Sequence, residues 1–549
     1  MLRPFFLLSV LLLTSFANAI GPGEGLRYLP VQDGGRVKPY STFAQETLEV
    51  VYGKKTFEKK AAWEVVLTWM LAPSAWAERE LFEVRNKDIL DALGLDSSRR
   101  WFKGDEIFAK ERFPELMQDL RVKRESKEKL TPYFQALQRI ENQWFVFREM
   151  ASGRLLRVFP PKEGETWLSV AELPEGPVQT AFLDVTEKFV SYLAKQADPN
   201  ADATEAGLAL NQSVASFEKL QQAENPQLII PSSRIAMEIH YLDFHPFRLA
   251  YVSYLLASIL LLLSWAFGRK GLMPASWFFV IVGFLLHTYG FGLRVYLAGR
   301  PPVANMYETV VWVAWGAILF AAILEYLNRT KFILLAGALG AWACLVMADS
   351  APAVLDPSLQ PLEAVLRSNY WLIVHVMTIT ISYAAFFLAF VLGDIGLFYY
   401  LKDPTKNRQQ IKSIVSAIYR SMQIGVAFLA PGIILGGVWA DYSWGRFWGW
   451  DPKETWALIA LLGYLAVLHA RLTNWMKDLG MIVAAVVTFS LVIMAWYGVN
   501  FVLGAGLHSY GFGAGGVEYV ATFIGVHLLF TLYIVVLQRG RERASGKSA

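Results

Sequence analysis

The chain has 549 residues, of which 54% are hydrophobic and 18% are charged. This balance is unlike that of an average soluble protein and indicates segments that lie in a membrane. The net charge of +4 is small, and no basic stripe alternates with aromatic residues, so no nucleic-acid partner is expected. A single cysteine, Cys344, excludes a disulfide within the chain, a CxxC redox pair and a thiolate metal site.

The first 19 residues predict an export signal. Arg3 precedes an apolar stretch that reaches about Leu13, and the small residues Ala17 and Ala19 frame a predicted cleavage site after Ala19. An uncleaved anchor helix is the alternative. In both interpretations the residues that follow are exported.

Residues 22–230 are mixed and mostly soluble in character, and they predict a mainly helical exported domain. Apolar residues recur at helical spacing in 57–71, 126–150 and 178–195. The region holds no histidine or cysteine and no obvious catalytic cluster. A docking or scaffold role is the favoured hypothesis, and the task itself is unassigned. A proline-bearing segment, 224–233, links this domain to the rest of the chain.

The chain changes character at about residue 240, after which apolar stretches long enough to span a bilayer recur. We therefore predict a polytopic α-helical membrane protein, with about nine transmembrane helices in 240–549. The spans are expected at 248–267, 274–292, 309–326, 331–348, 371–400, 423–440, 453–472, 479–500 and 517–537. The fifth is longer than a bilayer requires, so it is expected to tilt or to project.

The distribution of positive charge predicts the topology. Lys and Arg are frequent in the predicted inner segments, such as 402–412 and 539–543, and scarce in the predicted outer ones. We expect an inner-membrane protein whose carboxyl terminus is cytoplasmic. Its amino-terminal domain and its tryptophan-rich segment would lie on the periplasmic side.

That tryptophan-rich segment, 436–456, joins the sixth and seventh predicted spans. Five of the 19 tryptophans of the chain lie in its last 18 residues. Indole faces beside Gly445 and Gly449 predict a shelf for a large planar ligand, whereas a plain membrane anchoring belt is the alternative. The tryptophans considered for the shelf are Trp439, Trp444, Trp448 and Trp450.

Two histidines are predicted at the same outer surface. His375 lies just inside the outer end of the fifth span, and His508 lies in the loop before the ninth. Two neutral imidazoles can occupy both axial positions of a haem iron. A satisfied packing role is the alternative for each histidine.

A third histidine, His469, is predicted on the inner side. Asp451, Pro452 and Glu454 have the spacing of a helix start, with the Asp as N-cap. Counting along this helix places His469 about 27 Å from its start, near the inner leaflet. A polar side chain at that depth is a functional-site hypothesis and indicates a second ligand site.

The remaining histidines have less support. His287 lies two turns before Arg294 on the second span, and it is either a ligand or a helix-packing residue. His240, His245 and His527 have no companions in the sequence, so a structural role is favoured for them.

The segment 444–458, with the sequence WGRFWGWDPKETWAL, resembles the WWD signature of haem-handling proteins. Its continuation after the Trp-Asp pair is similar to the CcsA (ResC) branch of cytochrome c biogenesis system II. Further similar stretches are 299–308, 371–375 and 506–510, and the resemblance covers roughly 240–540. The amino-terminal domain is an addition to a minimal member of that family.

This resemblance implies a path for haem b, which is carried as a substrate. Haem passes from the cytoplasmic side to an external WWD site, where His375 and His508 hold the iron. His469 matches the membrane-embedded histidine of an internal haem site. The tryptophans and Asp451 belong to the external site. There haem is joined by two thioether bonds to the CxxCH motif of apocytochrome c, as in a holocytochrome c synthase.

The resemblance also implies partners. The second internal ligand comes from a ResB (CcsB) protein, and a separate partner is expected because the exported region lacks the spans of a fused ResB. His287 is then not needed as the opposite ligand. Arg294, Arg446 and Lys453 are candidates to pair with haem propionates, from charge and predicted side alone. Because Cys344 is buried and solitary, other proteins are expected to keep the substrate thiols reduced.

Three other functions stay open. They are a haem transporter without synthase activity, an electron-transfer membrane subunit with permanent bis-histidine haems, and a membrane scaffold. Permanent haems would need facing histidine pairs on the spans and no outer tryptophan loop. A scaffold has only the exported domain in its favour.

Overall fold

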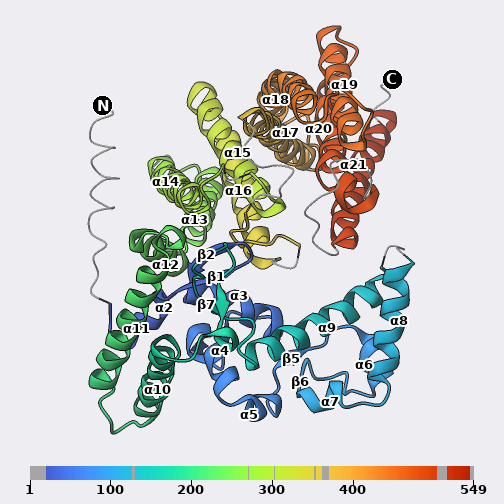
Figure 1. Cartoon of the computed structure of the whole chain (residues 1–549). Helices are drawn as coiled ribbons and strands as arrows, with labels where there is room; N and C mark the ends of the chain where they lie inside the picture. Colours follow the sequence, from blue (N-terminus) through green and yellow to red (C-terminus); the bar gives the residue numbers. More distant parts are fainter. Residues whose placement is uncertain are drawn as a thin grey trace. The chain divides into compact units, whose positions relative to one another are not determined.

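The computed structural model describes residues 20–126, 130–269, 271–301, 303–351, 354–361, 370–503 and 516–544 (Figure 1). The chain divides into two compact units, Met1–Asp243 and Phe244–Ala549. Each unit has its own hydrophobic core. The predicted export signal, 1–19, lies outside the described residues.

The amino-terminal unit is mainly helical around small sheets. Its helices are α2 (Gly25–Tyr28), α3 (Tyr40–Tyr52), α4 (Ala62–Leu71), α5 (Pro73–Ala77), α6 (Lys87–Leu93), α7 (Gly104–Phe108), α8 (Phe113–Glu125), α9 (Pro132–Ala151), α10 (Pro177–Ala197), α11 (Thr204–Glu224) and α12 (Ser232–Phe244), with short 3₁₀ turns η1 (Val170–Glu172) and η2 (Pro226–Leu228). Its strands are β1 (Pro30–Asp33), β2 (Arg36–Pro39), β3 (Thr56–Phe57), β4 (Lys60–Ala61), β5 (Phe82–Glu83), β6 (Trp101–Phe102), β7 (Arg157–Phe159) and β8 (Leu168–Ser169).

The largest sheet is antiparallel, in the order β2-β1-β7-β8. The helix predicted over 57–71 begins only at Ala62, because Phe57 belongs to a short hairpin. Glu58 and Lys59 turn that hairpin with positive φ angles, which no helix permits. The helix predicted over 126–150 begins at Pro132 as α9, and the helix predicted over 178–195 is confirmed as α10.

The carboxy-terminal unit is a bundle of long apolar helices. They are α13 (Pro246–Phe267), α14 (Leu272–Ala298), α15 (Met306–Asn328), α16 (Phe332–Ser350), α17 (Tyr370–Lys402), α18 (Arg408–Trp444), α19 (Pro452–Leu472), α20 (Asp478–Ile493) with its π-helical continuation η4 (Met494–Leu503), and α21 (Val517–Ala544). Among the described residues, nine helical segments are long and apolar enough to cross a bilayer. The prediction of a polytopic helical membrane protein is confirmed.

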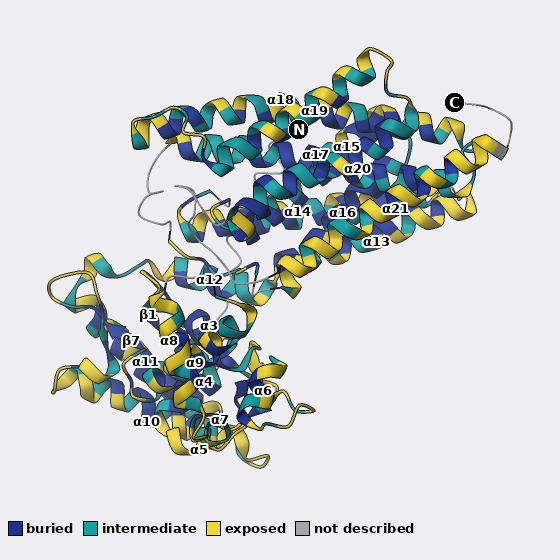
Figure 2. Ribbon diagram, turned by 90° about the vertical axis from the view of Figure 1, so that its right-hand side faces the viewer, coloured by how far each residue is buried: buried dark blue, intermediate teal, exposed yellow. Residues whose placement is uncertain are grey.

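Helix pairing sets up the interior of the bundle. α13 packs along α14, α15 along α16, and α17 along both α18 and α20. Many residues along α13 and α21 are exposed (Figure 2). Such exposed stretches suit lipid or a partner in the membrane.

The helix that contains the sixth predicted span, 423–440, extends well beyond it on the amino-terminal side. α18 begins at Arg408, and its first turns are polar on one side but bury Ile411, Val415 and Ile418 on the other. A hydropathy window detects only the uniformly apolar part of such a helix.

Candidate functional site

His375 lies near the start of α17 and contacts α18. Its Nδ1 is 2.7 Å from the main-chain oxygen of Gly432. A Cβ atom on Gly436, one turn later, would lie 2.6 Å from the His375 Cε1 atom, so only a glycine admits the imidazole there. Because a carbonyl oxygen only accepts, Nδ1 carries the hydrogen, and Nε2 keeps the lone pair that a metal uses.

The aromatic segment starts where α18 ends, at Trp444. Gly445 ends the helix in a left-handed conformation, with φ 69°. One turn earlier, Trp439 is 1% exposed and packs against Leu372 of α17. Its ring lies 4.6 Å from that of Trp444, at 67°. Trp439 therefore joins the aromatic segment to the helix that carries His375.

The four tryptophans do not form one flat shelf. Trp439 is part of the core, and Trp444 stands edge-on against it. Trp448 and Trp450 also meet at right angles, with ring centroids 5.8 Å apart and 89° between the planes. Trp450 is 69% exposed on a backbone with φ 55°, so it supplies the largest free indole face.

Glu454 closes the aromatic segment onto the start of α19. Its Oε2 accepts hydrogen bonds from the main-chain N–H groups of Gly449 (2.8 Å) and Asp451 (3.2 Å). Its Oε1 lies 3.4 Å from Nη1 of Arg446. The Asp451 carboxylate accepts from the N–H of Lys453 at 2.9 Å. The predicted helix start is confirmed, and it also fixes the loop.

The side chain of Lys453 connects this segment to two other parts of the bundle. Its Nζ donates to Oδ1 of Asn500 in η4 at 3.1 Å. The Asn500 amide nitrogen in turn lies 3.8 Å from the sulfur of Met306, which begins α15. The sequence stretches 299–308 and 444–458 therefore meet at one end of the bundle.

Arg294 belongs to a buried cluster of charged side chains. Its Nη2 lies 2.8 Å from Glu308, and its Nη1 donates to the main-chain oxygen of Pro357 at 2.8 Å. Arg300 contacts the other oxygen of Glu308 at 2.7 Å. Arg294 is 1% exposed. This arrangement favours a structural role over the predicted contact with a haem propionate.

His287 uses both ring nitrogens inside the bundle. Nε2 donates to the main-chain oxygen of Val311 at 3.1 Å, and Nδ1 accepts from the Tyr254 hydroxyl at 3.3 Å. The side chain is fully buried and stacks on Phe291. Of the two roles considered for His287, this geometry favours helix packing over ligation.

His469 lies near the other end of α19, on its outward face. The buried residues Ala457, Ala460, Tyr464 and Val467 mark the packed face, and His469 is on the opposite side of the helix. Its Nδ1 lies 2.7 Å from the main-chain oxygen of Leu465. Nδ1 therefore carries a hydrogen, as in His375, so Nε2 is the nitrogen that a neutral ring offers to a metal.

His508 lies outside the described residues, between Leu503, which ends η4, and Val517, which begins α21. The predicted pairing of His508 with His375 stays a prediction. In the described part of the chain, no group of three or more His, Cys, Asp or Glu side chains is arranged to hold a metal ion. A haem, which needs one or two protein ligands, does not require such a group.

Two features were missed at the level of sequence. Gly432 and Gly436 are the contacts of His375, and only the pairing of α17 with α18 reveals them. Asp394 of α17 lies 3.4 Å from His527 of α21. A lone aspartate inside a predicted span was the available signal for that pair.

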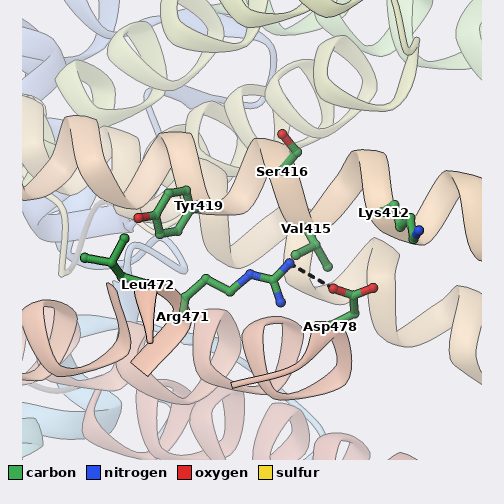
Figure 3. A pocket seen from close by; sticks show the side chains of 7 residues that line it. All are labelled: Lys412, Val415, Ser416, Tyr419, Arg471, Leu472 and Asp478. Atoms are coloured by element: carbon green, nitrogen blue, oxygen red, sulfur yellow. Dashed lines mark hydrogen bonds and ion pairs between the residues drawn. The ribbon is translucent and has the colours of Figure 1, made fainter. Parts of the chain in front are cut away.

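A cavity of about 450 Å³ opens between the start of α18 and the turn from α19 to α20 (Figure 3). Two of its lining residues, Arg471 and Asp478, form an ion pair of 3.0 Å. The other lining residues are Lys412, Val415, Ser416, Tyr419 and Leu472. None of the predicted haem-binding residues lines it.

Comparison with known proteins places the membrane unit in a known group. Residues 303–508 match the model of a family described as cytochrome C assembly protein. The chain is 32% identical over 315 residues to the cytochrome c biogenesis protein CcsA of Prochlorococcus marinus strain NATL2A, covering 50% of this chain and 98% of that protein. It is 38% identical over 226 residues to CcsA of Chlamydomonas reinhardtii, covering 39% of this chain and 62% of that protein.

A longer relative extends the likeness. The protein NrfI of Wolinella succinogenes is 30% identical over 500 residues, which is 87% of this chain. The matched part is longer than the membrane unit, Phe244–Ala549, so the similarity continues into the amino-terminal unit. The chain spans 53% of the length of NrfI.

Proposed function

Because the chain belongs to the CcsA family of cytochrome c biogenesis proteins, we propose that it moves haem b across the membrane and presents it for attachment to apocytochrome c. One observation carries the proposal. His375 is held against Gly432 and Gly436 with its metal-binding nitrogen defined, beside the pair Trp439–Trp444. An oriented imidazole and the aromatic segment, with the exposed Trp450, thus share one end of the bundle.

At that end His375 supplies one axial ligand of the haem iron, and His508 supplies the other. The main-chain oxygen of Gly432 fixes the tautomer and the ring plane of His375, as a second-shell acceptor does for a metal-bound histidine. The exposed face of Trp450 covers the porphyrin. We place this end on the periplasmic side.

The contribution of the chain to thioether formation is positional. In each bond the cysteine sulfur adds to one vinyl carbon of haem and its proton goes to the other, so the chain needs no nucleophile of its own. Holding the vinyl groups toward the CxxCH peptide converts a bimolecular encounter into an oriented one. Other proteins keep the peptide thiols reduced, since Cys344 is buried.

An internal haem site at His469 needs a partner. The imidazole lies on the outward face of α19, and no described residue forms a hydrogen bond or ion pair with its Nε2. On the same face Leu462 is 56% exposed. A polar group is costly against lipid, which favours a partner helix there. We assign this partner to the ResB (CcsB) type, which supplies the second ligand.

The amino-terminal unit is proposed to dock partners on the periplasmic side. Its likeness to part of NrfI supports a role shared with that longer relative. The described part of this unit holds one histidine, His240 in α12, and no cysteine, so its surface offers docking rather than haem ligation.

The external site is tested by His375→Ala in the full-length protein with its partner. Mature cytochrome c should be lost, some haem should stay bound, and added imidazole should restore part of the maturation because it replaces the missing ligand. The readouts are haem-stained cytochrome c and the absorption spectrum of the purified protein. Normal maturation by His375→Ala without imidazole would refute the external-ligand assignment.

The internal site is tested by His469→Ala, which should remove haem from the purified protein altogether. His287→Gln is the matched control, since that histidine lies in the packed interior, and it should keep haem. Full haem loading of His469→Ala would overturn the internal site. Thioether formation by purified protein, partner and apocytochrome separates a synthase component from a transporter that only delivers haem.

A further inference from the structure

We infer that Asp394 and His527 form a proton-binding site inside the membrane unit. Asp394 lies in the carboxy-terminal half of α17, and His527 lies in the middle part of α21. Oδ2 of Asp394 is 3.4 Å from Nε2 of His527. Both side chains are mostly buried, at 30% and 24% exposed. The inference does not depend on haem and stands apart from the proposed function.

The geometry of the pair favours a bound proton. Nδ1 of His527 is 2.7 Å from the main-chain oxygen of Phe523, which can only accept, so Nδ1 carries a hydrogen. Nε2 faces the carboxylate. A bare lone pair on Nε2 would oppose a charged carboxylate, so one further proton lies on Nε2 or on Asp394. An imidazolium–carboxylate pair and an imidazole–carboxylic acid pair hold the same number of protons.

The surroundings favour keeping that proton. Oδ1 of Asp394 is buried and has no hydrogen-bond partner among the described residues, so an isolated carboxylate there would be poorly solvated. The rings of Phe523 and Phe390 lie 4.3 Å and 5.0 Å from the imidazole. Aromatic faces attract a cationic imidazolium. Deprotonation would leave an unpaired negative charge in this apolar setting.

No other charge takes the place of the proton. In the described part of the chain, no further titratable or charged side chain contacts either member of the pair. Along α17 and α21 the nearest titratable side chains in sequence are Tyr399, Tyr400 and Tyr533. The charged groups and the other histidine lie farther away, toward helix ends: His375 and Lys402 on α17, Asp478 on α20, and Glu518 and Arg539 on α21. No hydrogen bond or ion pair joins the pair to the charged groups on α15, α16 and α18, which are Glu308, Glu325, Asp349, Arg408, Lys412, Arg420 and Asp441.

The site also joins two helices. α21 is the least buried of the candidate spans. Apart from the Asp394–His527 pair, its polar attachment to α17 comes from Gln538 and Arg541, which donate to the main-chain oxygen of Tyr400 at 2.8 Å and 2.9 Å. Loss of the proton would therefore weaken the Asp394–His527 contact in the middle of α21. The hydrogen bonds of Gln538 and Arg541 near the carboxyl end of the helix would remain.

The test is solid-state NMR of the full-length protein with ¹⁵N-labelled histidine and ¹³C-labelled aspartate, in lipid nanodiscs at pH 8. An isolated histidine is neutral there, since its usual pKa is about 6.5. We expect one histidine to remain doubly protonated, or one aspartate to remain a carboxylic acid. That signal should be lost in both Asp394→Asn and His527→Gln. His287→Gln, which removes a buried histidine without a carboxylate neighbour, should leave it in place.

Two results would overturn the proposal. One is a wild-type spectrum at pH 8 with only neutral histidines and ionised aspartates. The other is a retained signal that persists in both Asp394→Asn and His527→Gln. Because the first comparison uses the unaltered protein, it does not depend on how either variant folds.

Discussion

At the scale of single residues, His375 and His469 share one hydrogen-bonding pattern. Each places Nδ1 at 2.7 Å from a main-chain oxygen, Gly432 for the first and Leu465 for the second. Each therefore keeps its lone pair on Nε2, the form in which imidazole binds iron. His287 engages both nitrogens within the bundle and keeps none for a ligand.

The small size of Gly436 is the condition for the placement of His375. Gly436→Ala would add a Cβ 2.6 Å from the ring and force the imidazole or α18 aside. Overpacking of this kind costs about 1–3 kcal/mol. Where that cost falls on the haem-binding position of His375, it corresponds to a roughly 5- to 150-fold loss of haem affinity. We expect less mature cytochrome c, partly restored by imidazole. Gly292→Ala adds a methyl group to open space on α14 and should have no effect.

Glu218 of α11 predicts a pH dependence in the amino-terminal unit. Burial raises its pKa to about 7. The folded unit thus binds this proton more tightly than the unfolded chain. The contribution to stability is therefore full below the ordinary value of about 4.5 and is lost as the pH rises to about 7.

Glu218→Gln should remove this loss of stability at high pH, because the neutral amide does not ionise. We expect the variant to be more stable than the wild type at pH 8, by on the order of 1–3 kcal/mol, and little changed at pH 4. Pulse proteolysis in urea, scored by cleavage within 20–243 of the full chain, measures the difference. Glu187→Gln, on an exposed carboxylate of α10, is the control. An equal effect of both substitutions at pH 8 would contradict the prediction.

At the scale of elements, one helix start shapes the aromatic segment. The capping carboxylate of Glu454 holds the N–H groups of Gly449 and Asp451 and pairs with Arg446. The loop is thus closed by the same contacts that begin α19. The hydrogen bonds that cap the start of α19 therefore also set the shape of the candidate site.

Glu454→Ala should open this loop. Two main-chain N–H groups lose their acceptor, at a cost of about 1–2 kcal/mol. Amide hydrogen exchange at Gly449 and Asp451 should rise roughly tenfold, because 1.4 kcal/mol corresponds to a factor of ten. Haem attachment should fall with it. Asp441→Asn, on an exposed carboxylate of α18, should leave both measurements unchanged. Unaltered exchange in Glu454→Ala would rule out its closing role.

At the scale of the whole membrane unit, the two candidate haem sites lie at opposite ends of α19. The aromatic segment precedes its first turn, and His469 lies in its last turns. The buried cluster of Arg294, Arg300 and Glu308 ties α14 and α15 to residues 357–360. This cluster therefore supports the end of the bundle that carries the aromatic segment.

Glu308→Gln would leave two buried arginines short of one negative charge. Breaking a buried pair in this way costs about 3–5 kcal/mol. We expect a lower unfolding temperature of the membrane unit in nanodiscs, with haem binding at His469 retained in the protein that stays folded. Glu518→Gln, on a carboxylate at the start of α21 that forms no ion pair in the described part of the chain, is the comparison. A thermal shift no larger than that of Glu518→Gln would refute the supporting role.

Much of the fold followed from sequence because the signals are local. Runs of apolar residues longer than about 18 mark the spans whatever their neighbours are. The start of α19 was predictable from Asp451, Pro452 and Glu454, because capping involves residues only a few positions apart. The long first part of α18 escaped prediction, since only packing against other helices defines its buried side.

Only the tertiary structure decided how the functional side chains are used. The burial of Trp439, the ion pair of Arg294 and the contact of His375 with Gly432 each join residues far apart in the chain. The pairing of Asp394 with His527 joins residues that are separated by three helices. A sequence specifies which groups are available, but which of them stay free depends on the partners that folding brings within hydrogen-bond distance.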